Sequence, residues 1–587
     1  MIVPPITTFK GPLMGVHILH ALAVEMGYKT DILYLNVLLT PEIGAERFDY
    51  LSYRPFEIFY SMFNERLFAR SAHGLPPMGK TPEACTDELS SVSGGGDHQT
   101  MFHTSADFDL EAFLEMESIC YDFLQAAIPV IASLDYKIVG CTQREGQTNC
   151  STALLKGIKA LRPGIVTITG GSNCKGELAE GIASLSDAVD YIFEGESESA
   201  FVSFLENYSA GQLPSRRIIP GEFVKDLDTL PMPDYTPFIE QTKKFRGEDA
   251  LKKTSLIYET SRGCWWSARK GCRFCSEDIP FRQKKPGESA AAFKELCRRY
   301  RPEGIYMSDI SMPLSYNKEV FPALMEEEKR PVVYYQARTD LTPSDLLRLK
   351  EARIEQFTVG IEALSSGLLE LMNKGVTPRQ NLNFLRYARS IGLYADWLLL
   401  WGFPGDKIGY YRETLELLPL IRHLQPPAAM VHHFLTRFSP YFKNPAEYGI
   451  TNIRPWAVYD MIFPQWADKD KLATWFTGDY PCEAHENPGV MKAIAEEIRT
   501  WKEKWQTTRL VMIPFQDCYL VIDNRGIDGK RQLVLEYGRA KEIMTAAIYN
   551  ESEHQQWAVE EKLAILDGSW FVPLVTASPG LLIRFEE

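Results

Sequence analysis

Three cysteines stand close together near the middle of the chain, in the segment CWWSARKGCRFC. Iron–sulfur clusters take thiolate ligands, and three thiolates on one loop can hold three irons of a [4Fe–4S] cluster while the fourth iron stays open. A zinc ion is the alternative, but zinc usually takes four ligands and no fourth Cys or His lies nearby in the sequence. The spacing therefore predicts a [4Fe–4S] cluster with Cys264, Cys272 and Cys275 as its metal ligands.

The cysteine segment follows the first strand of a region in which apolar strands and helical stretches alternate. The candidate strands cover residues 256–260, 304–308, 332–336, 356–360, 394–401 and 430–435. Six strand–helix units predict a partial (βα)6 barrel of the TIM type over residues 255–440, and the reacting groups of such barrels lie at the C-terminal ends of the strands. The three cysteines fall at that end of the first strand.

The N-terminal part of the chain shows a second strand–helix alternation. Its candidate strands cover residues 1–4, 31–36, 136–141, 165–169 and 188–193. The pattern predicts an α/β fold with a doubly wound, Rossmann-like domain over residues 1–210, whose ligand should bind at the carboxyl ends of the strands.

Three further segments complete the predicted organisation. Residues 74–104 are rich in Gly, Pro and Ser and are predicted to form a mobile loop. The proline-containing stretch LDTLPMPDY indicates a linker over residues 211–254. Residues 441–587 are predicted to form a small C-terminal α/β domain.

Charge and hydropathy exclude some classes of partner. The 587 residues carry a formal net charge of −14, which disfavours binding to a phosphate backbone. No stretch of about 18 uninterrupted apolar residues is present, and the first residues do not read as a secretory leader. We therefore expect a cytoplasmic protein with neither a nucleic-acid nor a membrane partner.

The cysteine segment, read as SRGCWWSARKGCRFC, resembles the signature of the B12-dependent radical S-adenosylmethionine (SAM) enzymes that mature ribosomal peptides. Other stretches resemble that family in the same order, over roughly residues 10–460. They are GGSNCKGE, FEGESESAF, EQFTVGIEALSSGLLELMNKGVT, LLLWGFPGD and RFSPYF. The resemblance implies SAM at the cluster and cobalamin bound to the N-terminal domain.

The turns after the N-terminal strands supply the residues that the resemblance assigns to cobalamin. Glycines would let the cofactor approach the backbone, and polar side chains would bond to its tail or amides. The candidates are Thr142, Gln143, Gly170, Gly171, Ser172, Asn173, Gly195 and Glu196. An ordinary set of α/β turns is the alternative. Because no D-x-H-x-x-G motif is present, we expect no protein imidazole on the cobalt.

One departure from the family pattern bears on mechanism. Most family members follow the last cysteine with glycine and a neutral run, whereas this chain has Ser276 and Glu277. The tryptophan 2-C-methyltransferases of thiopeptide biosynthesis place a glutamate on the fourth iron and an arginine beneath the cobalt. Glu277 is similar in position to that glutamate, and Arg66 or Arg70 lies in a comparable region, with Arg70 as our candidate. A solvated loop carboxylate is the alternative for Glu277.

Residues at the ends of the barrel strands are expected to hold SAM or the methyl acceptor. Carboxylates can bind the SAM ammonium or ribose, and an arginine can pair with its carboxylate. The cofactor-binding candidates are Asp309, Gln336, Arg338, Glu362 and Phe274. Of these, Phe274 is expected to pack around the cluster loop. Structural ion pairs are the alternative for the charged ones. Tyr306 is a possible contact for an aromatic substrate. One of His432 and His433 must face inward if the last strand is regular, and we expect it to be a core histidine.

Together these features predict an enzyme that moves a methyl group from SAM, through methylcobalamin, to a carbon atom. Our specific prediction is C2 of tryptophan, by polar transfer. The alternatives are radical C-methylation of an unactivated carbon in a ribosomal precursor peptide, transfer of another part of SAM, and a non-catalytic cobalamin or redox module. An electron donor for cobalamin reduction is the expected partner.

Overall fold

The computed structural model describes residues 1–7, 11–45, 47–48, 58–77, 110–313, 315–325, 330–527 and 529–586. The chain divides into two compact units. The first comprises Met1–Ile257 and Ile453–Thr477, and the second comprises Tyr258–Asn452 and Gly478–Glu587. Of the predicted mobile loop 74–104, residues 78–104 lie outside the described part.

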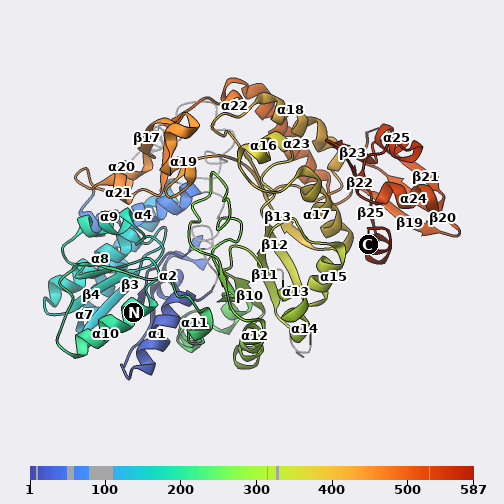
Figure 1. Cartoon of the computed structure of the whole chain (residues 1–587). Helices are drawn as coiled ribbons and strands as arrows, with labels where there is room; N and C mark the ends of the chain where they lie inside the picture. The colour runs from blue at the N-terminus through green and yellow to red at the C-terminus, as the bar shows by residue number, and fades with distance from the viewer. Residues whose placement is uncertain are drawn as a thin grey trace. The chain divides into compact units, whose positions relative to one another are not determined.

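The first unit is built on a six-stranded sheet in which every neighbouring pair is parallel (Figure 1). The strands are β1 (Ile2–Val3), β2 (Leu33–Tyr34), β3 (Ile138–Thr142), β4 (Val166–Gly170), β5 (Tyr191–Glu194) and β6 (Ile218–Pro220), in the order β2-β1-β3-β4-β5-β6. The order reverses between β1 and β3, which is the topological switch point where such sheets bind ligands. The predicted Rossmann-like fold is confirmed.

Helices cover this sheet through apolar side chains. They are α1 (Met14–Glu25), α2 (Leu35–Ile43), α4 (Ile58–His73), α7 (Leu110–Ser133), α8 (Thr148–Leu161), α9 (Glu177–Leu185), α10 (Glu198–Ser209) and α11 (Thr236–Arg246). Phe201 and Phe204 of α10 pack on Phe193 of β5, with ring centroids 6.0 and 5.5 Å apart. Within the described residues, no helix is long and apolar enough to cross a membrane.

The second unit contains the barrel, except that the first barrel strand, β7 (Ser255–Tyr258), begins in the first unit. The other barrel strands are β10 (Gly304–Met307), β11 (Val332–Ala337), β12 (Ile354–Val359), β13 (Tyr394–Asp396), β14 (Leu398–Trp401) and β15 (Ala429–His432). One sheet has the order β13-β12-β11-β10-β7, and a second pairs β14 with β15. A bridge between Glu362 and Leu399 joins the two, so the six predicted strands form one curved parallel array with the fifth interrupted at Trp397.

Helices on the buried face of this array alternate with the strands, as the sequence predicts. They are α12 (Pro286–Tyr300), α13 (Tyr316–Glu319), α14 (Phe321–Leu324), α15 (Pro343–Glu351), α16 (Ser366–Leu371), α17 (Pro378–Ile391) and α18 (Ile408–Leu417). Along β11, Val333, Tyr335 and Ala337 are buried while Tyr334 and Gln336 are half-buried. One face of the barrel sheet therefore packs against helices, and the other carries the more accessible side chains.

The division of the chain differs from the predicted domains in two places. Residues 211–254 contain β6 and α11 rather than only a linker, and they group with the first unit. The prolines before α11 extend the backbone for only a few residues, after which the helix begins. Phe238 of α11 packs edge-on against Tyr34, with ring centroids 4.9 Å apart. Residues 453–477 also join the first unit, where Ile462 accepts a 2.7 Å hydrogen bond from Asn149.

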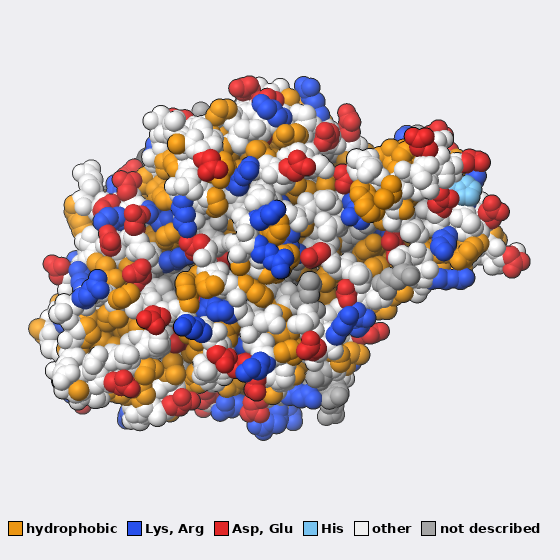
Figure 2. All heavy atoms as spheres, viewed as in Figure 1, with side chains coloured by type: hydrophobic (Ala, Val, Ile, Leu, Met, Phe, Trp, Pro, Cys, Tyr) orange, Lys and Arg blue, Asp and Glu red, His pale blue; other side chains and the backbone are white. Residues whose placement is uncertain are grey.

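The rest of the C-terminal region belongs to the second unit. It contains a four-stranded sheet of order β21-β20-β19-β25 and a three-stranded sheet of order β22-β24-β23. Their bounds are β19 (Leu510–Phe515), β20 (Cys518–Asp523), β21 (Arg531–Leu535), β22 (Ala547–Ile548), β23 (Ala564–Asp567), β24 (Trp570–Pro573) and β25 (Thr576–Ala577). The accompanying helices are α23 (Pro488–Lys504), α24 (Tyr537–Met544), α25 (Glu553–Glu560) and α26 (Pro579–Glu586). On the face drawn in Figure 2, acidic and basic side chains are interspersed.

Candidate iron–sulfur and cofactor sites

The three cysteines lie on a single loop at the C-terminal end of β7. This cluster loop (residues 263–281) is closed by an antiparallel pair of short strands, β8 (Ser261–Arg262) and β9 (Arg282–Gln283). Gly263 has a φ of +81°, and a Cβ there would stand 2.7 Å from the Pro280 carbonyl oxygen, so only glycine fits where the loop closes. The loop thus begins and ends at the edge of the barrel where the sequence places the reacting groups.

The loop carries the type of donor that an iron–sulfur cluster requires. All three donors are thiols, and the charges of neighbouring cysteines act on both Cys272 and Cys275. Burial raises the pKa of Cys272, and it raises the pKa of Cys275 to about 12, so metal binding at these thiols must displace protons. Within the described ranges, no three His, Cys, Asp or Glu side chains converge as they would on a single metal ion.

Glu277 lies beside the cluster cysteines. Its backbone N–H points to the Cys275 sulfur at 3.5 Å, and its carbonyl oxygen accepts a hydrogen bond from the Ser267 hydroxyl. The next residue, Asp278, forms a 2.8 Å ion pair with Lys443. The backbone around Glu277 is therefore fixed next to Cys275, while ligation of iron by its carboxylate stays a prediction.

Asp309 bonds to the residues that lead into the cluster loop. Its fully buried carboxylate accepts hydrogen bonds from the Thr260 N–H at 2.8 Å, the Thr260 hydroxyl at 2.6 Å and the Ser261 hydroxyl at 2.6 Å. Burial raises the pKa of Asp309 to about 7, against these hydrogen bonds. Asp309 therefore braces the chain that enters the cluster loop, and its predicted contact with SAM stays untested.

Arg338 and Glu362 reach the cluster loop from two neighbouring strands. The Arg338 guanidinium lies 4.9 Å from the Trp265 ring and 5.3 Å from the Trp266 ring, measured to the ring centroids. Glu362 forms a buried ion pair with Lys374, with 2.8 Å between Nζ and Oε1. The charges of both predicted residues act on Cys272, and one oxygen of Glu362 is already bonded to Lys374.

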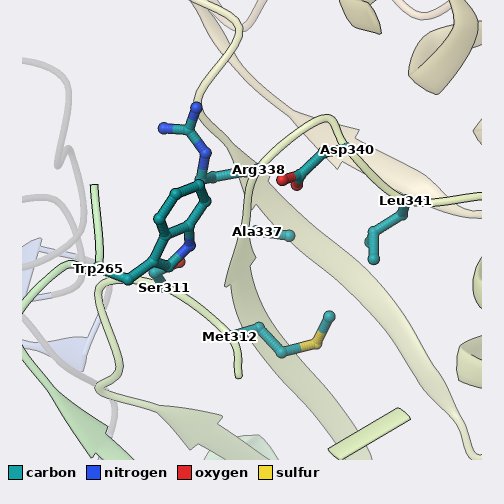
Figure 3. A pocket seen from close by; sticks show the side chains of 7 residues that line it. All are labelled: Trp265, Ser311, Met312, Ala337, Arg338, Asp340 and Leu341. Atoms are coloured by element: carbon teal, nitrogen blue, oxygen red, sulfur yellow. The ribbon is translucent and has the colours of Figure 1, made fainter. Parts of the chain in front are cut away.

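A small pocket opens beside Trp265 and Arg338, at the ends of β10 and β11 (Figure 3). Its lining residues are Trp265, Ser311, Met312, Ala337, Arg338, Asp340 and Leu341. Figure 3 shows the Trp265 indole alongside Arg338, with Asp340 on the loop that follows. Ser311, Met312 and Asp340 were not predicted as site residues, although their positions just after predicted strands could have identified them.

Tyr306 and Gln336 lie on the accessible face of the barrel sheet. Tyr306 is paired in register with Tyr334, and their rings stack with centroids 6.4 Å apart. Gln336 is paired with Thr358, and Thr358 with Asp396. These pairs form two polar and aromatic rows across the strands, and the alternation of strand residues could have identified Tyr334, Thr358 and Asp396.

Phe274 of the cluster loop packs against His433. The Phe274 ring lies edge-on to Phe403 at 5.8 Å and to His433 at 6.5 Å, and His433 stacks on Phe403 at 4.5 Å. Burial lowers the pKa of His433 to about 3, which keeps the ring neutral. His433 is thus a core histidine, as expected, whereas the half-buried His432 has its Nε2 only 2.7 Å from Nε2 of His485.

The predicted cobalamin residues come together at the carboxyl edge of the first sheet. Hydrogen bonds from Asn173 N–H to the Gln143 carbonyl oxygen and from Gly195 N–H to the Cys174 carbonyl oxygen, both 3.1 Å, hold the loops after β3, β4 and β5 side by side. The Gln143 side chain is 1% exposed, and among the described residues its oxygen has no hydrogen-bond partner. A Cβ at Gly195 would meet only open space.

These observations fit a ligand with amide groups at this edge, but not every candidate is available. The Thr142 hydroxyl donates to Gln147, and the Glu196 carboxylate accepts from the Val224 N–H. At Gly171, a Cβ would stand 2.3 Å from the Gln143 carbonyl oxygen, so this glycine permits close packing of two loops. Ser172 is exposed, and Gly170 ends β4.

The arginines of α4 have partners on α7. Arg70 lies over the Tyr121 ring at 3.8 Å, and Arg66 forms a buried 2.9 Å ion pair with Glu117. The structure therefore gives Arg70 an aromatic contact, and its predicted place beneath a cobalt ion stays untested. Glu65, which the sequence analysis missed, accepts hydrogen bonds from the Thr148 and Asn149 N–H groups and so fixes α4 at the start of α8.

Comparison with known proteins gives the class of the barrel domain. Residues 258–418 match the model of the Radical SAM superfamily. The chain therefore carries a radical SAM domain, which implies a [4Fe–4S] cluster and SAM as its cofactors.

Two curated relatives resemble parts of the chain. An uncharacterized methyltransferase of Pyrococcus horikoshii, PH0819, is 22% identical over 307 residues, which are 49% of this chain and 64% of the relative. The hopanoid C-3 methylase of Methylococcus capsulatus is 26% identical over 255 residues, which are 41% of this chain and 48% of the relative. The chain thus spans less than two thirds of the length of either relative.

A solved structure shares the fold of this chain over most of its length. The radical SAM methyltransferase TsrM from Kitasatospora setae, with tryptophan and a SAM analogue bound, matches with a TM-score of 0.51 at 12% identity. The match covers 88% of this chain and 91% of TsrM. A second TsrM structure, with cobalamin and a [4Fe–4S] cluster bound, matches with a TM-score of 0.50 at 12% identity and covers 85% of this chain and 88% of TsrM. At this identity the likeness is one of fold.

Proposed function

We propose that this chain is a SAM-dependent C-methyltransferase that uses a [4Fe–4S] cluster at Cys264, Cys272 and Cys275 and a cobalamin bound to its first unit. The observation that carries the proposal is the cysteine loop at the C-terminal end of the first strand of a radical SAM barrel. A doubly wound sheet with a polar carboxyl edge, in the same chain, supports the second cofactor. Both curated relatives are named as methyltransferases or methylases.

The side chains around the cluster loop would bind and orient the cofactors. When bound, the cluster would supply a redox-active iron centre at this edge of the barrel, and cobalamin would carry the methyl group. Arg338 would pair with a carboxylate such as that of SAM, and Trp265 would cover one side of the same pocket. Gln143 would donate or accept hydrogen bonds to an amide-rich ligand at the first sheet.

We propose tryptophan C2 as the methyl acceptor. The fold shared with TsrM, whose structure contains tryptophan, supports this choice. Indole C2 is nucleophilic and can accept a methyl cation without a radical, after which its proton leaves to a base. The position of Glu277 beside Cys275 supports this polar route, because a carboxylate on the fourth iron would leave no site there for SAM. Radical methylation within a ribosomal precursor peptide is the alternative.

Product analysis tests the proposal. Anaerobically reconstituted protein with SAM, methylcobalamin and tryptophan should give 2-methyltryptophan and S-adenosylhomocysteine, with almost no 5′-deoxyadenosine. Replacing all three cluster cysteines by Ala should remove most of the iron and the activity, whereas the control Cys518→Ala, in the C-terminal sheet, should retain both. Formation of 5′-deoxyadenosine in step with a methylated peptide would instead support radical methylation of a precursor peptide. A chain that binds no cobalamin, or a triple variant with full iron, would refute the proposal.

A further inference from the structure

The connection between α16 and α17 holds the cluster loop through backbone groups. We call residues 371–375 the bracing segment. Three of its carbonyl oxygens accept hydrogen bonds from the cluster loop, and one of its side chains donates to the loop. The bonds are Arg273 N–H to Met372 O (2.9 Å), Arg273 guanidinium to Leu371 O (2.9 Å), Trp266 Nε1 to Asn373 O (2.9 Å) and Asn373 Nδ2 to Gly271 O (2.7 Å).

The bracing segment also packs closely against the cluster loop at Gly375. Gly375 has a φ of +69°, and a Cβ there would stand 2.2 Å from the Trp266 ring. Arg338 donates hydrogen bonds to the Lys374 and Gly375 carbonyl oxygens at 3.3 and 3.1 Å. The segment is therefore fixed against the loop on both sides of Cys272.

Lys374, in the middle of this segment, places a buried positive charge beside the cysteines. Its side chain is 9% exposed, and its ammonium is 2.8 Å from the Glu362 carboxylate. A Cβ at Gly360 would stand 2.7 Å from Lys374 Nζ, so a side chain there would fill the space that the ammonium occupies. The ammonium lies 5.7 Å from the centroid of the Phe274 ring, and Phe274 directly precedes Cys275. The neighbouring Asn373 bonds to the Gly271 carbonyl oxygen, directly before Cys272. The ammonium is thus held beside the part of the loop that carries both cysteines.

We propose that Lys374 is a positioning residue that raises the reduction potential of the cluster, while Glu362 limits that effect. An added electron makes the cluster more negative, and a nearby cation in a medium of low dielectric constant stabilises the reduced form. The bracing segment fixes the distance of the cation from the thiolates. This proposal rests on the cluster part of the proposed function and requires neither cobalamin nor a methyl acceptor.

The proposal can be tested by removing either charge of the Lys374–Glu362 ion pair. A purely structural role predicts no opposite shifts of the reduction potential in the two variants. The variants are Lys374→Met, Lys374→Arg and Glu362→Gln, and the control is Lys492→Met on the exposed face of α23. For each, iron per chain is measured after anaerobic reconstitution, and the midpoint potential is measured by redox titration monitored by electron paramagnetic resonance. Lys374→Met should lower the potential and Glu362→Gln should raise it. Lys374→Arg and the control should stay close to wild type.

Shifts in the same direction for Lys374→Met and Glu362→Gln, or no shift in either at full iron content, would overturn the proposal. If Lys374→Met loses its iron, Glu362→Gln decides, because an unchanged or lower potential in that variant contradicts the assigned role. The titration uses the full chain without SAM or acceptor. A protein that binds its cluster but methylates nothing would therefore contradict the proposed function without affecting this inference.

Discussion

At the scale of single residues, two buried carboxylates fix the backbone near the two candidate cofactor sites. Asp309 binds the Thr260 N–H at the entrance of the cluster loop, and Glu65 binds two N–H groups in the first turn of α8. Burial raises the pKa of each to about 7. Each carboxylate therefore exchanges hydration for directed hydrogen bonds, and its contribution to stability depends on pH.

The variant Glu65→Gln should isolate the part of the pH-dependent stability that comes from Glu65. Because the pKa of Glu65 rises from its ordinary value of 4.5 to about 7, the folded state holds its proton longer than the unfolded state. The stability of the wild type should therefore fall as pH rises from about 4.5 to about 7, by about 1.4 kcal/mol for each pKa unit at most. Glu65→Gln has no proton to lose at this position.

The measurement is the thermal unfolding midpoint of both proteins between pH 5 and 8. The midpoint of Glu65→Gln relative to wild type should increase with pH up to about 7 and then level off. Glu25→Gln, on the exposed end of α1, controls for the loss of one carboxylate from the chain. A constant difference between Glu65→Gln and wild type across this range would contradict the argument.

At the scale of elements, periodicity located the strands of the barrel and five of the six strands of the first sheet. All six barrel strands and the five N-terminal strands lie at or within a few residues of their predicted positions, because buried parallel strands form short apolar runs. Contacts between distant segments could not be read in this way. Trp266 bonds to Asn373, which is 107 residues away, and nothing local in either segment encodes that pairing. Because of the prolines before α11, a linker was predicted where the structure has a helix that contacts β2.

The bracing segment should be sensitive to a single added methyl group. Gly375→Ala combines a left-handed backbone with a Cβ 2.2 Å from the Trp266 ring, so the loop and the segment must move apart. We expect a loss of about 2–4 kcal/mol of stability and a lower iron content after reconstitution.

Gly392→Ala is the matched control for this substitution. Gly392 ends α17 with a φ of +77°, but a Cβ there meets nothing within 4 Å. It should cost only about 1 kcal/mol and leave the iron content unchanged. Equal iron content in the two variants, measured by colorimetric iron assay, would show that the bracing segment does not support the cluster loop.

At the scale of the whole molecule, the C-terminal region is part of the second unit rather than an appended domain. The fully buried Arg386 of α17 bonds to the Met544 carbonyl oxygen at 3.1 Å and pairs with Glu586. Asp567 accepts a hydrogen bond from the Arg379 N–H, and the Arg379 guanidinium lies 3.8 Å from the Trp570 ring. The barrel helices therefore bury polar and charged groups against residues near the end of the chain.

Removing residues 507–587 should prevent the remaining chain from folding, because Arg386 would lose its buried partners and the covered face of α17 would be exposed to water. We expect aggregated protein without a cluster, measured by size-exclusion chromatography and iron content. The point variant Arg379→Ala, which removes only a peripheral contact, should cost about 1 kcal/mol and stay monodisperse. A truncated chain that is monodisperse and holds a full cluster would refute this view.

The first unit is assembled from two separate stretches, and this has a consequence for synthesis. Residues 453–477 supply α20 (Val458–Ile462) and α21 (Lys469–Leu472), and a Cβ at Gly181 of α9 would stand 2.8 Å from the Lys471 backbone. Proteins made on the ribosome generally fold their N-terminal domains first. Here the N-terminal unit has all of its residues only once residue 477 has been made, after the barrel strands. A nascent chain stalled at residue 257 should therefore expose the surface of α9 that α21 covers, and completion of the two units should come late and close together in time.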